Sequence, residues 1–256
     1  MTADDTYQMT ATSRVDEAHI RDVLCVALTI STGAVDAISW LGLGKIFSAF
    51  MTGNVAFLGF RVGGAPGPSV SRTLAATAAF ALGAFLAARI LRRTPKSDSV
   101  WPRSAIVSLT PALVLQAGFL ALWATVSGNP STGTGDLLIA LSGAAMGMQT
   151  ATIFSLGVRA DFTTAATATL AVLMGDLAGW SQTRGERQRL AATLLGLFAG
   201  AAVGGILMVE ARTWAPALPL GVTAVVLIAA TLVFERGTSW VRRSSSASRR
   251  ASATTT

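Results

Sequence analysis

The 256-residue chain has very few of the side chains that build disulfides, metal centres or soluble surfaces. Cys25 is the only cysteine, which excludes an intramolecular disulfide and a thiolate cluster for zinc or iron–sulfur. His19 is the only histidine, so no spacing of His and Cys typical of a metal site occurs. Charged residues make up only 13% of the chain, against roughly 25% in soluble domains. We therefore expect no metal and no cofactor.

Apolar residues dominate instead. They make up 52% of the chain, and the mean hydropathy is +0.56. They form long blocks without the alternation of half-buried soluble helices, which predicts an all-α integral membrane protein. The first block begins at Val23, is too long for a signal-peptide core and follows the acidic residues Asp16 and Glu17, so we expect it to remain as a membrane helix.

Eight apolar segments follow one another along the chain. A membrane helix needs about 20 residues, and six segments meet that length: 23–44, 70–91, 104–126, 136–158, 190–210 and 214–234. The segments 46–60 and 163–180 are shorter or interrupted. We expect about six transmembrane helices plus two short re-entrant or broken segments.

The positive charges test this topology, because loops on the cytoplasmic side hold most Lys and Arg. If the two short segments return to the face they entered, only four of the 20 basic residues lie outside: Lys45, Arg61, Arg72 and Arg212. If all eight segments cross, the dense basic loop 89–103 lies outside as well. The first topology is favoured, with both termini cytoplasmic.

The domain boundaries follow from composition. We expect a disordered cytoplasmic tail over 1–20, a single membrane domain over 21–236 and a disordered basic cytoplasmic tail over 237–256. The net charge of +7 reflects the positive-inside bias, and no aromatic residues interleave with the arginines as base stacking would require. We therefore expect the lipid bilayer, and not nucleic acid, as a partner. The sequence is compatible with an oligomer.

The membrane domain contains an internal repeat, with halves 21–127 and 136–236. Gly33–Ala37 aligns with Gly147–Ala151, and Met51–Asn54 aligns with Ala166–Thr169. Each match is followed by a helix with small residues every four positions, a pattern that lets helices pack closely in lipid. Three spans are an odd number, so the halves enter from opposite faces and form a 3+3 inverted repeat, as in many secondary transporters.

Asp36 is the most informative residue, because a carboxylate in an apolar membrane helix costs roughly 2.5–3.5 kcal/mol and marks a functional site by default. A hydrogen bond to a neighbouring helix is the purely structural alternative. Close behind it, Thr52-Gly53-Asn54 interrupts a short segment, and a broken helix exposes backbone groups that can bind a ligand or an ion. The candidate site in the second half consists of Gln149, Thr150, Thr167 and Thr169. A possible second acid, Asp176, lies near a helix end.

The strings Gly33-Ala-Val-Asp-Ala37, Phe50-Met-Thr-Gly-Asn54 and Gly147-Met-Gln-Thr-Ala151 resemble the YoaK-like family of bacterial multi-pass membrane proteins, a domain-of-unknown-function family. The resemblance implies an inner-membrane protein of about six spans without an established substrate. Thr150 stands where that family commonly has asparagine, and Ala168 stands where Thr-Gly would recur, so the second half is expected to be more helical.

These features predict a small secondary transporter or permease for a small polar solute, proton-coupled through Asp36. A channel-like pore built from the two broken segments is one alternative, and a non-transporting structural or regulatory membrane protein is another. An enzyme is not expected. The chain has no Gly-x4-Gly-Lys-Ser/Thr string for ATP, and Asp176 lacks the Gly-x-Gly-Asp context of intramembrane aspartyl proteases, which disfavours an acid pair with Asp36.

Overall fold

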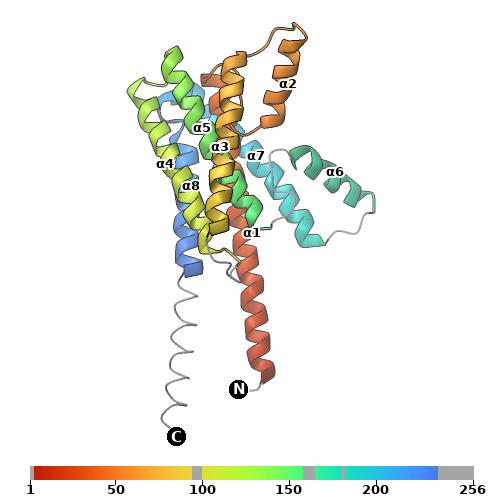
Figure 1. The fold of residues 1–256 in the computed structure, drawn as a ribbon. Helices are drawn as coiled ribbons and strands as arrows, with labels where there is room; N and C mark the ends of the chain where they lie inside the picture. Colours follow the sequence, from red (N-terminus) through yellow and green to blue (C-terminus); the bar gives the residue numbers. More distant parts are fainter. Residues whose placement is uncertain (1–2, 94–99, 158–164, 180–182, 236–256) are drawn as a thin grey trace.

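The computed structural model describes residues 3–93, 100–157, 165–179 and 183–235, which are almost entirely helical (Figure 1). No strand occurs in these ranges, and the all-α fold class is confirmed. The helices are α1 (Ala3–Gly42), α2 (Met51–Val62), α3 (Val70–Arg93), α4 (Arg103–Thr125), α5 (Thr132–Ser155), α6 (Ala165–Leu177), α7 (Arg184–Glu210) and α8 (Ala217–Ala230). A short 3-10 helix, Arg212–Trp214, precedes α8, and a π-helical turn, Thr231–Glu235, follows it.

Six stretches of helix are long and apolar enough to cross a membrane: Glu17–Gly42, Val70–Arg93, Arg103–Thr125, Thr132–Ser155, Gly185–Glu210 and Arg212–Phe234. Each overlaps one of the six predicted spans. α1 begins at Ala3, so helix runs through residues 3–20, where composition predicts disorder. That segment has no glycine or proline to end a helix. The predicted tail 237–256 lies outside the described residues.

The two remaining helices are too short to cross a bilayer. α2 has 12 residues and α6 has 13, whereas a membrane span needs about 20. α2 lies beside the end of the bundle where α1 stops and α3 starts, and α6 flanks α7 (Figure 1). Each short helix therefore belongs to a connection between two spans, in agreement with the predicted re-entrant or broken segments.

Helices α1 and α7 are in close backbone contact, and they run parallel. A methyl group added at Gly33 would overlap the carbonyl oxygen of Leu197, and one added at Gly200 would overlap that of Ile30. Close approach of two helix backbones in lipid depends on such small residues. The glycines on both helices set the distance between them.

A second parallel pair, α3 with α5, has the same type of contact. A methyl group at Gly147 would overlap the carbonyl oxygen of Phe80, and one at Gly83 would overlap that of Ala144. α4 packs along α5, α8 packs along α1, and α4 meets α8. The spacing of small residues is therefore a packing signal in both halves, as predicted.

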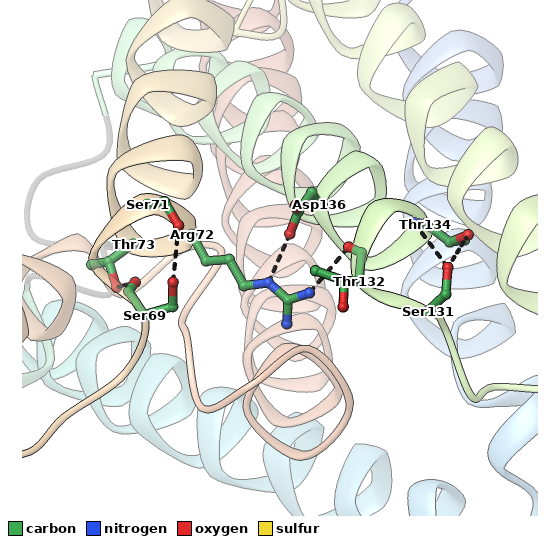
Figure 2. Close-up of polar contacts among 8 residues, drawn as sticks. All are labelled: Ser69, Ser71, Arg72, Thr73, Ser131, Thr132, Thr134 and Asp136. Atoms are coloured by element: carbon green, nitrogen blue, oxygen red, sulfur yellow. Dashed lines mark hydrogen bonds and ion pairs between the residues drawn. The ribbon is translucent and has the colours of Figure 1, made fainter.

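Polar contacts tie the loops together at the end of the bundle where α1 stops. Arg72 at the start of α3 donates from Nε to Asp136 of α5 at 2.7 Å and from Nη2 to the carbonyl oxygen of Thr132 at 3.1 Å (Figure 2). Arg212 donates from Nε to the carbonyl oxygen of Gly128 at 2.7 Å. These contacts fix the start of α3, the start of α5 and the 3-10 helix before α8 at this end of the bundle.

Candidate functional site

Asp36 lies on α1, six residues before the helix ends at Gly42. Its Oδ1 accepts hydrogen bonds from the backbone N–H groups of Ser48 and Ala49, at 2.9 and 2.8 Å. Both residues stand just before α2, and the N-terminal end of a helix attracts negative charge. The Asp36 carboxylate therefore binds the start of the first short segment instead of a side chain on a neighbouring helix.

Asn54 fixes the same connection from the other side. It is fully buried, its Oδ1 accepts from the N–H of Phe47 at 3.1 Å, and its Nδ2 donates to the carbonyl oxygen of Phe47 at 2.7 Å. Gly53 leaves room for the rings of Phe47 and Phe50, because an added methyl group would lie 3.0 Å from the first ring and 2.7 Å from the second. Thr52 is exposed. The connection 43–50 thus has one defined conformation.

A chain of three buried serine hydroxyls links this connection to two spans. Ser48 Oγ lies 2.6 Å from Ser39 Oγ on α1 and 2.7 Å from Ser142 Oγ on α5. Ser142 also donates to the carbonyl oxygen of Ile139 at 3.2 Å. Ser48 therefore holds α1, α5 and, through its backbone N–H, Asp36 in one hydrogen-bonded unit.

Asp36 lines a cavity of about 510 Å³ that opens on the side of the bundle. The lining comes from α1, the connection before α2, the first turn of α6 and α7. Its residues are Gly33, Asp36, Ala37, Trp40, Leu41, Phe47, Phe50, Ala166, Leu197, Ala201 and Gly205. Asp36 is the only titratable side chain among them, and no ion pair joins it to a basic residue in the described ranges.

Residues 24–229 match the model of a family described as "Protein of unknown function (DUF1275)". The chain belongs to this family. It is similar to the UPF0700 transmembrane protein YoaK of Bacillus subtilis (strain 168), with 33% identity over 162 residues that make up 63% of this chain and 69% of that relative. No solved structure matches the chain. The predicted YoaK-like resemblance is confirmed.

In this member of the DUF1275 family, the second-half candidates lie apart from the cavity. Gln149 on α5 is buried and donates to the carbonyl oxygen of Leu28 at 3.2 Å and to Thr32 Oγ1 at 3.0 Å. Thr150, the next residue, is half-buried and does not line the cavity. α5 carries Gln149 to the contact with α1, on the opposite side from α7.

The threonine candidates on α6 also lie apart from the cavity. Thr169 is buried and Thr167 is exposed, and the cavity is reached instead by Ala166. Asp176 Oδ2 forms an ion pair with Arg187 Nε at 2.5 Å, across the connection from α6 to α7. Asp176 therefore has a helix-end partner of its own and forms no pair with Asp36.

The sequence did not single out Ser48, Trp40 or Phe47 as site residues. A serine or an aromatic residue in an apolar segment is common, and neither carries the cost that marks Asp36. The signal that points to them is proximity to an interrupted segment, since all three lie between Asp36 and Asn54. Trp40 follows Asp36 by one turn of α1, and the packing of the 43–50 connection against α1 brings Phe47 and Ser48 to the carboxylate.

Proposed function

We propose that this membrane protein is a small secondary transporter for a small polar solute, coupled to protons through Asp36. The observation that carries the proposal is the position of Asp36, which lines a lateral cavity and at the same time binds the backbone of the connection that forms one of its walls. A carboxylate that lines the cavity and also binds the backbone of its wall can couple proton binding to the shape of the cavity.

The coupling follows from hydrogen-bond chemistry. An ionised carboxylate accepts stronger hydrogen bonds from N–H groups than a protonated one does. Protonation of Asp36 weakens its bonds to Ser48 and Ala49 and so loosens the attachment to α1 of the segment between Phe47 and Phe50, two residues that line the cavity. Deprotonation restores the wall. Proton binding and the shape of the cavity are then linked.

The arrangement of the helices supports an internal repeat of the kind found in many secondary transporters. The contact of Gly200 with Ile30 in the α1–α7 pair has a counterpart of the same register in the contact of Gly83 with Ala144 in the α3–α5 pair. The contact of α8 with α1 likewise corresponds to that of α4 with α5. We infer that the two halves are inverted copies.

We also infer a bacterial inner membrane with both termini in the cytoplasm. The basic residues support this orientation, because they gather at the end of the bundle where α1 starts, as cytoplasmic ends do. On the described helices these are Arg21, Arg89, Arg92, Arg93, Arg103, Arg184, Arg187 and Arg189. The opposite end carries Lys45, Arg61, Arg72 and Arg212.

The test is solute-dependent proton movement in proteoliposomes that contain a pH-sensitive dye. Small amino acids, amines, sugars and carboxylic acids are added one at a time to the purified, reconstituted protein. We expect at least one of them to move protons, and we expect Asp36→Asn to abolish that movement at unchanged yield and thermal stability. Solute flux without a pH response, unaffected by Asp36→Asn, would indicate a channel. No flux with any solute would contradict transport.

A further inference from the structure

The described part of the lateral cavity's wall is almost entirely apolar. Apart from Asp36, the lining side chains that the structure describes are aliphatic or aromatic, together with glycine. A sugar or another solute with many hydroxyl groups would lose its hydrogen bonds to water here and find few replacements, which is costly. The cavity therefore favours a ligand with an apolar body and a single polar group.

Three aromatic residues line the cavity together with Asp36. Trp40 and Phe47 stack with their ring centroids 4.9 Å apart, and Phe50 meets Phe47 edge-on at 5.2 Å. All three line the cavity. The faces of aromatic rings attract cations, and tryptophan does so most strongly. The aromatic residues and the carboxylate thus both favour a positively charged ligand.

The charge of Asp36 is not balanced by a basic side chain in the described part of the chain. The hydrogen bonds from Ser48 and Ala49 both go to Oδ1, and a carboxylate has about four lone-pair sites, so the group keeps capacity for a ligand in the cavity. A divalent metal ion does not fit this chemistry, because one carboxylate supplies at most two of the six or more oxygen ligands that it needs, and an apolar wall cannot hydrogen-bond the water molecules that would supply the rest. One carboxylate in an apolar wall matches a monovalent organic cation.

We propose that the cavity binds an organic cation with a compact apolar body, such as an aromatic amine or a quaternary ammonium compound, with its charge at Asp36 and its body against Trp40 and Phe47. The cavity volume of about 510 Å³ falls within the range of small-molecule sites, roughly 300–1,000 Å³. This inference rests on the proposed transport function and names the class of its solute.

The experiment measures binding to the full-length protein in a neutral detergent, by thermal shift and by equilibrium dialysis. The probe is phenyltrimethylammonium, which joins a permanent charge to an aromatic ring. Tetramethylammonium retains the charge without the ring, and benzenesulfonate retains the ring with a negative charge. We expect phenyltrimethylammonium to bind at least tenfold more tightly than tetramethylammonium, and benzenesulfonate not to bind.

Two variants locate the ligand. Asp36→Asn should weaken binding of phenyltrimethylammonium at least tenfold, since it removes the charge and keeps an oxygen for Ser48 and Ala49. Trp40→Leu should weaken binding by about tenfold, as expected for the loss of a desolvated cation–aromatic contact. Leu195→Ala, at an exposed position of α7 that does not line the cavity, is the matched control and should bind like the wild type.

The inference is overturned if phenyltrimethylammonium and benzenesulfonate bind equally tightly, or if Asp36→Asn leaves the binding of phenyltrimethylammonium unchanged. It is also overturned if a photoreactive residue in place of Leu197 crosslinks to a lipid acyl chain and phenyltrimethylammonium does not reduce that crosslinking. Binding in detergent needs no transport, so a protein that binds the cation without moving it contradicts only the proposed function. A protein that moves protons with another solute and ignores the cation contradicts only the inference.

Discussion

Asn54 binds both backbone polar groups of Phe47, accepting from the N–H at 3.1 Å and donating to the carbonyl oxygen at 2.7 Å. The Asn54 side chain thus provides the two hydrogen bonds that a residue of a neighbouring β-strand would form with the backbone of Phe47. The amide is fully buried, and its third contact is to the sulfur of Met51 at 3.7 Å. The asparagine of the Met-Thr-Gly-Asn string therefore shapes the connection before α2, and its geometry leaves it little capacity to bind a solute.

Asn54→Ala should lower the free energy of unfolding by about 2 kcal/mol, because an unsatisfied buried polar group costs about 1–3 kcal/mol. Thermal unfolding of the purified protein measures the change. Thr52→Val is the matched control in the same string, and its exposed side chain should give a change within about 0.5 kcal/mol. Equal losses in both variants would show that Asn54 does not hold Phe47.

At position 36, two substitutions separate structure from function. Asp36→Asn keeps an oxygen that accepts from Ser48 and Ala49, whereas Asp36→Ala leaves both N–H groups without it. We expect the alanine variant to be less stable than the asparagine variant by about 1–3 kcal/mol. Thermal unfolding of the two variants side by side gives the difference, and similar stability would mean that the carboxylate does not anchor the connection.

The sequence predicts the six spans well because bilayer thickness sets the length of an apolar run, and Asp36 stands out because its charge is costly in such a run. The ligands of that charge could not be predicted in the same way. The N–H groups of Ser48 and Ala49 are backbone atoms, which every residue carries. Only the return of the 43–50 connection against α1 selects them.

The position of Gln149 shows a second limit. The repeat aligns it beside the counterpart of Asp36, which predicts a shared site. Helix α5 packs on α3 and turns Gln149 toward Leu28 and Thr32, whereas the cavity lies between α1 and α7. Alignment of two halves gives the equivalent positions, but it does not say which helix each position faces.

The glycines in the two parallel pairs should be intolerant of a single methyl group. Gly200→Ala and Gly83→Ala each place that group on a backbone carbonyl oxygen, of Ile30 and of Ala144 respectively. Overpacking of this kind costs typically about 1–3 kcal/mol. We expect both variants to lose thermal stability to a similar degree.

Gly118→Ala on α4 is the control for these two glycines, because no atom lies within 4 Å of the added methyl group. Alanine is the better helix former, so this variant should be at least as stable as the wild type. The yield and the unfolding temperature of Gly200→Ala, Gly83→Ala and Gly118→Ala measure these effects. A stable Gly200→Ala protein would contradict the close α1–α7 contact.

Gln116 on α4 is the least satisfied polar side chain in the described core. It is 6% exposed, and neither its amide nitrogen nor its amide oxygen has a hydrogen-bond partner. It lines a small cavity of about 20 Å³ with Ser142, Pro216 and Pro219. Gln116→Met keeps the shape without the polar atoms and should raise stability by about 1 kcal/mol. A loss of stability would instead indicate that water in this cavity binds the amide.

The orientation of the bundle in the membrane can be tested at the ends of α2 and α3. Val62 at the end of α2 is 91% exposed, and Arg93 at the end of α3 is exposed. Single cysteines at these two positions, in a Cys25→Ala background that removes the one buried native thiol, can be labelled with a membrane-impermeant maleimide.

With both termini in the cytoplasm, Val62→Cys reacts in intact cells, whereas Arg93→Cys reacts only after the membrane is permeabilised. With the opposite orientation the pattern reverses, because α1 then ends and α3 then starts on the cytoplasmic side. The two positions respond in opposite directions, so poor expression of one variant cannot imitate either pattern. The same labelling determines on which side of the membrane the 43–50 connection, and with it the lateral cavity at Asp36, meets water.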